Sequence, residues 1–163
     1  MSQLSEFIQL VENPQEVGRK DGKWFYHESP EGGLPTLGYG HKLTQNEYDT
    51  NFVYGINLKY GCSDEEIEFI LTTDLEKSKN VAKNCVPEFE DLDNLKQDIL
   101  TEFAFNLGYG LNKFKKFKKA IIEDDWSAMK AEYKRFYRNS KGVLKELQDR
   151  NDKFYHYFLS GHP

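Results

Sequence analysis

No apolar run in the sequence approaches the roughly 20 residues that a bilayer-spanning helix needs, so no such helix is expected. The first residues, MSQLSEFIQLVENP, lack the basic stretch and long apolar segment of a secretory signal peptide. We therefore expect the chain to fold in a cytoplasm. Only two cysteines occur, Cys62 and Cys85, which are too few for a disulfide framework and lack metal-ligand spacing. Internal repeats and low-complexity tracts are also missing, so a single globular protein without a metal or cofactor is expected.

Charge is present in quantity and is distributed unevenly. Charged residues make up 30% of the 163 residues and hydrophobic residues 38%, a composition typical of folded domains. Residues 1–60 have a net charge of −3, residues 61–100 of −7 and residues 101–163 of +5, which sum to the −5 of the whole chain. A basic C-terminal third favours an anionic polymer as partner. The bacterial envelope and nucleic acid both fit, and charge alone does not choose between them.

Hydrophobic spacing predicts one short helix followed by a small sheet. Apolar residues in segment 4–11 recur with helical spacing, and Pro14 ends this helix near Asn13. Turn-forming residues and β-formers then predict a small antiparallel sheet with strands near 23–27 and 35–40.

From Ser63 onward the pattern is helical. Ser63 and Glu66 form the signature of a capping box, and the apolar stripe behind it predicts a long helix that ends near Asn84. Further helices are expected over residues 92–107, 112–123, 125–138 and 143–158. Their candidate N-caps are Asn112, Asp124 or Asp125, and Ser140, and Ser2 or Ser5 would cap the first helix.

These elements predict an α+β fold that is mainly α. We expect one domain over residues 1–163, with a sheet-containing lobe at 13–62. A connecting helix at 63–84 would join it to a helical lobe made of residues 1–12 and 85–163. A cleft between two such lobes is the natural place for a ligand.

Glutamates surround the predicted sheet. Glu12 lies at the C-terminal end of the first helix, where a carboxylate opposes the helix dipole. Glu28 and Glu31 lie in the turn that precedes Thr36. Glycosidic hydrolysis needs two carboxyl groups around a cleft, one that donates a proton and one, ionised, that activates water. Taken alone, these glutamates are more typical of solvated surface acids.

Several motifs together point to a known family. Residues 36–41 (TLGYGH) resemble the Thr-x-Gly-x-Gly-His signature of the phage lysozymes of glycoside hydrolase family 24, the T-even coliphage type. Residues 105–108 (FNLG) are similar to the family's Phe-Gln-x-Gly helix end, and residues 135–137 (RFY) to its Arg-Trp-Tyr. The resemblance covers nearly the whole chain in order, and it implies a lysozyme-like fold.

The resemblance implies an N-acetylmuramidase that cuts the β-1,4 bond between N-acetylmuramic acid and N-acetylglucosamine in peptidoglycan. The family inverts the anomeric centre and uses no cofactor. Glu12 would be the general acid, and Thr36 would hold the attacking water. The second carboxylate is expected to be Glu31, five residues before Thr36 and close to the family's spacing. Glu28 is the alternative, because it keeps the family's register after Tyr26.

Five further residues receive expected roles. Arg150 resembles a C-terminal arginine that orients the catalytic glutamate, while Asn106 and Arg135 would bind the substrate. His41 is expected to pair with Asp74, which lies on the apolar stripe of the long helix and needs a partner there. That pair would serve stability and not catalysis.

The expected biological role is that of an endolysin, held in the host cytoplasm and released to the periplasm and cell wall at lysis. Peptidoglycan is the expected partner of a monomer with neither a nucleic-acid partner nor stable membrane insertion. The first alternative is a lytic transglycosylase, which cuts the same bond but leaves a 1,6-anhydro product. The second is a non-catalytic envelope- or nucleic-acid-binding module that uses the basic C-terminal third. Glu12, the acidic turn and Thr36 together argue against this module.

Overall fold

The computed structural model describes residues 2–163, which divide into two compact units, one ending at Glu76 and the other covering Lys77–Pro163. Helices predominate and every sheet is a two-stranded antiparallel hairpin, so the predicted α+β, mainly α fold class is confirmed. Among the described residues, no helix is both long enough and apolar enough to cross a membrane. The assignment of the chain to a single domain, with two lobes joined by a connecting helix, stays a prediction.

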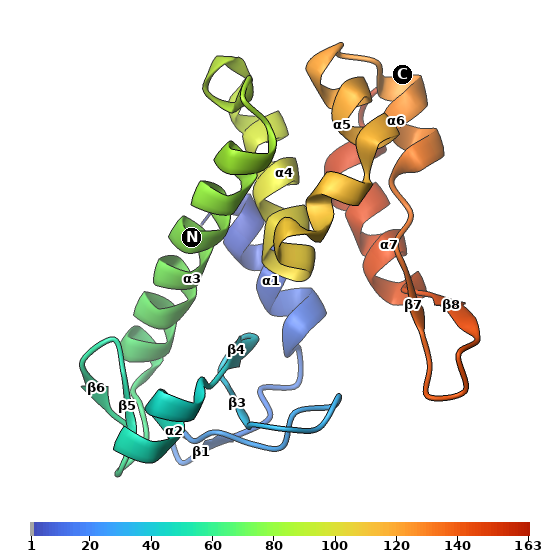
Figure 1. Ribbon diagram of the computed structural model, residues 1–163. Coiled ribbons are helices and arrows are strands. Elements are labelled where there is room, and N and C mark those ends of the chain that lie inside the picture. The colour runs from blue at the N-terminus through green and yellow to red at the C-terminus, as the bar shows by residue number, and fades with distance from the viewer. Residues whose placement is uncertain (1) are drawn as a thin grey trace. The chain divides into compact units, whose positions relative to one another are not determined.

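Among the described residues, the first unit contains a ten-residue helix, three hairpins, a shorter helix and the start of a long helix that continues into the second unit (Figure 1). In order these are α1 (Gln3–Glu12), β1 (Arg19–Lys20), β2 (Lys23–Trp24), β3 (Thr36–Leu37), β4 (His41–Lys42), α2 (Gln45–Thr50), β5 (Phe52–Val53), β6 (Ile56–Asn57) and α3 (Asp64–Cys85). The strands are shorter than the sequence predicts, because irregular turns separate them.

Local capping explains where the helices of this unit begin. The Ser2 hydroxyl accepts a hydrogen bond from the amide of Ser5 at 3.1 Å, so Ser2 is the cap of α1. The predicted capping box before α3 is confirmed: the amide of Glu66 donates to Ser63 Oγ at 3.1 Å, and the Ser63 amide donates to Glu66 Oε1 at 2.9 Å. Helix α2, which the sequence analysis does not predict, starts with a second box formed by Thr44 and Glu47.

The core of the first unit lies under its hairpins. It consists of buried apolar side chains from β2 through α3, namely Trp24, Leu37, Leu43, Val53, Leu58, Cys62, Ile67 and Ile70. Burial raises the pKa of the Cys62 thiol to about 11, so this cysteine is an unreactive packing residue. Because Leu37 is anchored in this core, the adjacent Thr36 is held firmly in β3.

The second unit contains the remaining helices and one further hairpin (Figure 1). After α3 follow the 3₁₀ turn η1 (Phe89–Asp91), α4 (Asn94–Leu107), the 3₁₀ turn η2 (Gly108–Lys113), α5 (Lys115–Ile122), α6 (Trp126–Glu132), β7 (Phe136–Arg138), β8 (Leu144–Glu146), α7 (Gln148–Phe154) and the π-helical turn η3 (Tyr155–Leu159). Its core is aromatic: Phe103 stacks on Phe117 with ring centroids 4.5 Å apart and meets Phe154 edge-on at 5.3 Å.

Two of the predicted helices are wrong in extent. The helices expected over 125–138 and 143–158 are interrupted by the β7–β8 hairpin. Gly142 adopts a positive φ of 76° in the connecting turn, where the backbone carbonyl of Val143 accepts from the amide of Asn139. Ser140 lies in this turn and caps no helix. Asp125 caps α6 as predicted, whereas α5 begins after Phe114 and not at Asn112.

Candidate active site

The C-terminal end of α1 places Glu12 beside a turn of the first unit. Glu12 is the last residue of α1, as expected, and no basic residue in the last helical turn offsets its charge. A Cβ atom on Gly40 would lie 3.1 Å from Glu12 Oε2 and 3.3 Å from its Cδ. Gly40 also has a positive φ of 92°. Only glycine therefore combines this backbone conformation with such a close approach to the carboxylate.

Asn13 fastens the end of α1 to that same turn. Its side chain is buried, and its Nδ2 donates to the carbonyl of Gly38 at 3.1 Å and to that of Val17 at 3.0 Å. Its Oδ1 accepts from the amide of Val17 at 2.9 Å. Asn13 thus fixes the position of Glu12 relative to the turn between β3 and β4. Sequence reasoning missed this role, because an asparagine before a proline indicates no more than the end of a helix.

Thr36 lies in β3 with its side chain buried. Its amide and carbonyl exchange hydrogen bonds with those of His27 at 2.8 and 2.9 Å. The Thr36 hydroxyl lies 2.6 Å from Ser29 Oγ, and Ser29 Oγ donates to the carbonyl of Leu34 at 2.5 Å. Because the single hydroxyl proton of Ser29 is used on Leu34, Thr36 donates its own proton to Ser29. The lone pairs of the Thr36 oxygen then remain to accept a hydrogen bond from another group.

The two candidate second carboxylates lie on either side of Ser29 in the chain, before the strand that carries Thr36. Glu28 directly follows His27, which pairs with Thr36 in an isolated bridge, and Glu28 itself belongs to no strand. Glu28 is exposed and lines a surface pocket of about 460 Å³ together with Tyr26 and Tyr48.

Glu31 lies close to the strand partner of Thr36. Glu31 Oε1 is 3.5 Å from Lys42 Nζ, and Lys42 is the direct strand partner of Thr36. Paired residues of antiparallel strands project to the same face of a sheet. The Glu31 side chain is 60% exposed. Among the described residues, no hydrogen bond joins Thr36 to the carboxylate of Glu28 or Glu31.

His41 follows the glycine turn and sits between two carboxylates. His41 Nδ1 lies 2.8 Å from Asp74 Oδ2, and His41 Nε2 lies 3.0 Å from Glu47 Oε1. The hydroxyl of Tyr54 donates to Asp74 Oδ1 at 2.5 Å. Burial lowers the pKa of His41, but the hydrogen bonds and charges of Asp74 and then Glu47 outweigh it, so that the pKa is raised. This geometry ties β4, α2 and α3 together and suits a structural role.

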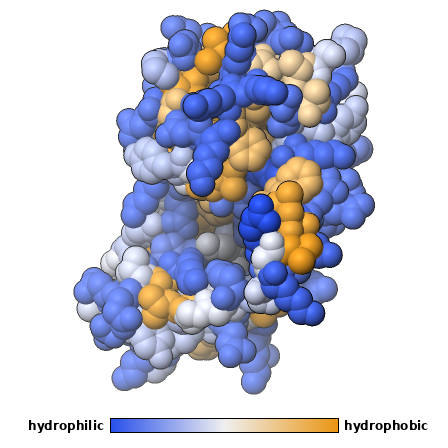
Figure 2. All heavy atoms as spheres, turned by 45° about the vertical axis from the view of Figure 1, so that its right-hand side comes forward, coloured by the Kyte–Doolittle hydropathy of each residue, from blue (hydrophilic) through white to orange (hydrophobic). Residues whose placement is uncertain are grey.

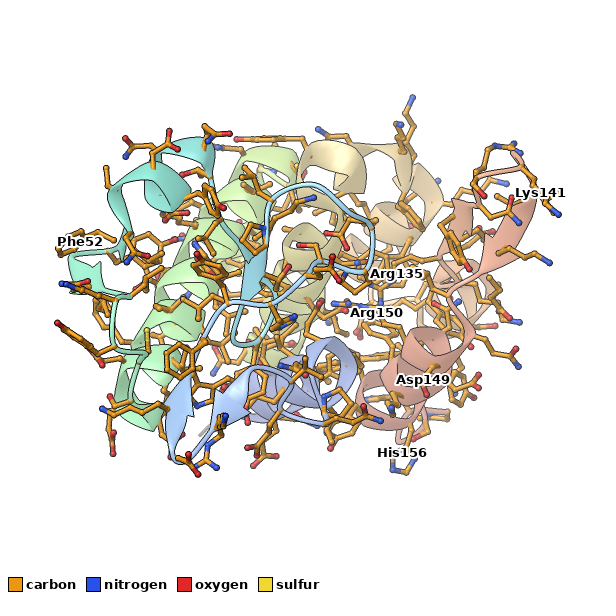
Figure 3. All side chains as sticks on the ribbon, turned by 90° about the horizontal axis from the view of Figure 1, so that it is seen from below. Phe52, Arg135, Lys141, Asp149, Arg150 and His156 are labelled. Carbon is orange, nitrogen blue, oxygen red and sulfur yellow. The ribbon has the colours of Figure 1, made fainter. Side chains whose placement is uncertain are left out.

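In the second unit, a buried carboxylate joins two of the predicted site arginines. Glu102 is fully buried in α4, and its Oε2 lies 2.8 Å from Arg135 Nη1. Glu102 Oε1 accepts from Arg150 Nε at 2.9 Å. Figure 3 shows the labelled Arg135 and Arg150 close together in this unit. Glu102 was not singled out from the sequence, where a glutamate in a helix indicates an exposed residue.

The surroundings of Arg135 correct its expected role. Its side chain has no exposed surface, and its guanidinium carbon lies 4.0 Å from the ring centroid of Phe103. A side chain without exposed surface cannot touch a substrate, so Arg135 does not bind it directly. Arg135 Nη1 instead donates to Asn106 Oδ1 at 3.2 Å, which positions the partly exposed Asn106. The roles of Asn106 in substrate binding and of Arg150 in orienting Glu12 stay predictions.

No group of three or more histidine, cysteine, aspartate or glutamate side chains could hold a metal ion among the described residues. What the first unit brings together is a carboxyl group, a glycine turn and a buried threonine hydroxyl. These are groups for proton transfer and for orienting water.

Comparisons with known proteins identify the family. The sequence profile of the family described as Phage lysozyme matches residues 23–153. No sequence among curated proteins matches significantly.

Solved structures with the same fold have low sequence identity. The endolysin from Escherichia coli O157:H7 phage FAHEc1 matches with a TM-score of 0.62 and 17% identity, covering 99% of this chain and 94% of that one. The muramidase domain of SpmX from Asticaccaulis excentricus gives a TM-score of 0.60 and 18% identity over 98% and 97% of the two chains. The active form of the P1 phage endolysin Lyz gives 0.55 and 16% over 97% and 94%. The family match covers most of the chain, which therefore belongs to the phage lysozyme family of glycoside hydrolases.

Proposed function

We propose that the protein is an endolysin that hydrolyses the β-1,4 bond between N-acetylmuramic acid and N-acetylglucosamine in bacterial peptidoglycan. Membership of the phage lysozyme family supports the substrate class. The observation that carries the assignment is the placement of the Glu12 carboxylate against Gly40, in the hairpin that also bears Thr36. The enzyme would be made in the host cytoplasm and would reach the cell wall at lysis.

In the proposed mechanism, Glu12 protonates the leaving oxygen and an ionised carboxylate activates water on the opposite face of the sugar. Glu31 is our choice for this base, since its carboxylate lies 3.5 Å from Lys42 Nζ and Lys42 is the strand partner of Thr36. The attacking water would give one proton to the Glu31 carboxylate and would donate its other hydrogen to the Thr36 oxygen. The Thr36 oxygen can accept this bond because the Thr36 hydroxyl proton is donated to Ser29. Inversion requires the two carboxyl groups to be about 6.5–9.5 Å apart, leaving room for that water.

The central test is the activity of Glu12→Gln on purified peptidoglycan. Glutamine keeps the shape of the side chain but has no proton to give, so turnover should fall at least ~10²-fold. Glu6→Gln is the matched control, because Glu6 is an exposed glutamate in the first turn of the same helix. This control should retain full activity. A Glu12→Gln enzyme as active as the control would refute the proposal.

The choice between the two candidate bases needs its own pair of variants. Glu31→Gln should impair hydrolysis severely and Glu28→Gln should leave it nearly unchanged, with both proteins folded. The opposite pattern would assign the base to Glu28.

The identity of the product separates a hydrolase from a lytic transglycosylase. Mass spectrometry of muropeptides released by the enzyme should find a hydrated reducing end. A 1,6-anhydro end would instead show that no water attacks, and the roles proposed for Glu31 and Thr36 would fail.

A further inference from the structure

The β7–β8 hairpin exposes several large apolar side chains to solvent. Four large hydrophobic side chains lie about half exposed within nine residues: Phe136 at 49%, Tyr137 at 48%, Val143 at 48% and Leu144 at 54%. Single exposed apolar residues are ordinary on protein surfaces, but four on one short hairpin, distributed over both of its faces, indicate an interaction surface.

Cations alternate with these apolar side chains. In the hairpin register, Arg138 lies directly opposite Leu144, and Tyr137 lies opposite Lys145. Lys141 occupies the end of the hairpin, as Figure 3 shows, and its side chain is exposed. Figure 2, turned so that this side comes forward, shows strongly hydrophilic and strongly hydrophobic side chains next to one another on the face it presents.

The single acidic residue of the two strands does not offset this charge. Glu146 Oε1 lies 3.5 Å from Lys134 Nζ, so a lysine just before the hairpin neutralises it. Arg138, Lys141 and Lys145 therefore give the hairpin a net positive charge along its whole length.

The hairpin is also held firmly at its base. The amide of Arg135 donates to Asn151 Oδ1 at 3.1 Å, and Asn151 Nδ2 returns a bond to the Arg135 carbonyl at 3.0 Å. The Leu147 amide donates to that same carbonyl at 3.0 Å. At the other end, Arg138 Nη1 donates to the carbonyl of Gly142 at 2.9 Å. An isolated two-stranded hairpin is marginal in water, so these bonds keep a preformed surface presented to solvent.

We propose that the β7–β8 hairpin binds the surface of an anionic phospholipid bilayer. Its aromatic and aliphatic side chains would enter the headgroup region, while Arg138, Lys141 and Lys145 contact lipid phosphates. Interleaved apolar and basic residues fit this interface, which offers negative charge and an apolar phase within a few ångströms. A glycan or a nucleic acid could engage the cations, but neither offers an apolar phase for Val143 and Leu144. Such binding would hold the enzyme at a membrane independently of glycan hydrolysis.

Co-sedimentation with vesicles tests the proposal. The full-length protein should bind vesicles of equal parts phosphatidylglycerol and phosphatidylcholine at low salt and should not bind phosphatidylcholine alone. Lys141→Glu replaces one positive charge with a negative one. Each charge near an anionic surface changes affinity about fivefold, so this variant should bind about thirtyfold more weakly. Phe136→Ser should weaken binding at least about tenfold, because it removes the largest wholly apolar side chain of the hairpin.

Two matched variants control these changes. Phe52→Ser removes an aromatic ring that is 46% exposed on another hairpin, β5–β6, whose two strands contain no lysine or arginine. Lys20→Glu reverses an exposed charge on the β1–β2 hairpin. Both should bind vesicles like the parent protein. Melting temperatures establish that each variant is folded, and if Phe136→Ser does not fold, the exposed tip variant Lys141→Glu decides.

Three outcomes would overturn the proposal. The parent protein could fail to distinguish anionic from neutral vesicles, or the controls could lose as much binding as the hairpin variants. In the third, the hairpin variants would lose activity on lipid-free peptidoglycan while their vesicle binding stays unchanged. The hairpin would then bind the glycan substrate and not a membrane. We expect activity on that lipid-free substrate to remain at the parent level.

Discussion

Replacing Glu102 with glutamine would leave two buried guanidinium groups without the carboxylate that now faces both of them. The Glu102 side chain is fully buried, and its oxygens lie 2.8 Å from Arg135 Nη1 and 2.9 Å from Arg150 Nε. Glutamine fills the same space, but it has no charge and presents an amide donor to a site lined by donors. Breaking a buried ion pair by removing one partner costs about 3–5 kcal/mol. In a chain of this size the melting temperature should fall by about 6–20 °C.

Thermal unfolding followed by circular dichroism would measure this change. Glu90→Gln is a suitable control, because Glu90 Oε1 also lies 2.9 Å from a cation, Lys83 Nζ, but its side chain is 71% exposed. Exposed pairs contribute at most about 1 kcal/mol, so this control should shift the melting temperature little. If Glu102→Gln unfolds at the temperature of the control, burial is not what makes the Glu102 pair important, and the reasoning is wrong.

The remaining predictions concern the first unit. His41→Gln should lower the melting temperature most below about pH 6.5, where protonated His41 is stabilised by Asp74, and the loss should shrink as pH rises through the raised folded-state pKa. A fall in melting temperature that does not depend on pH would contradict the ion pair. Asp74→Asn should also lower stability, while leaving peptidoglycan hydrolysis near the parent rate. Gly40→Ala should reduce both stability and turnover, since the added methyl meets the Glu12 carboxylate. Gly55→Ala has a similar positive φ and open space around it, so it should reduce stability alone; equal activity in the two variants would count against the position assigned to Glu12.

Elements decided by neighbouring residues could be predicted from the sequence. The Ser63 and Glu66 capping box and the stop imposed by Pro14 depend on a few adjacent side chains, and both predicted boundaries lie within a residue or two of those observed. The β7–β8 hairpin could not be predicted in this way. Tyr133 and Phe136 continue the helical spacing of α6, whereas the contacts of the intervening Arg135 with Glu102 and Asn151 join residues far apart in the sequence.

The candidate site also contains some features that have a local sequence pattern and others that depend on distant residues. The glycines of the TLGYGH segment and Thr36 could be identified from sequence, because their spacing is local and their residue types are restrictive. The contact between Asn13 and Gly38 spans 25 residues, and the use of the Ser29 proton on Leu34 depends on the shape of one turn. Neither has a local pattern that would reveal it.

The Glu47 carboxylate takes part in two interactions. Its Oε1 accepts from the Thr44 amide at 2.9 Å and so completes the cap of α2, and the same oxygen lies 3.0 Å from His41 Nε2. Loss of the Nε2 proton of His41 would remove its hydrogen bond to this carboxylate, while the bond from the Thr44 amide stays. Local opening of α2 is therefore linked to the charge of a side chain outside that helix. Amide hydrogen exchange in α2, corrected for its intrinsic pH dependence, should report the titration of His41 while the rest of the unit stays closed.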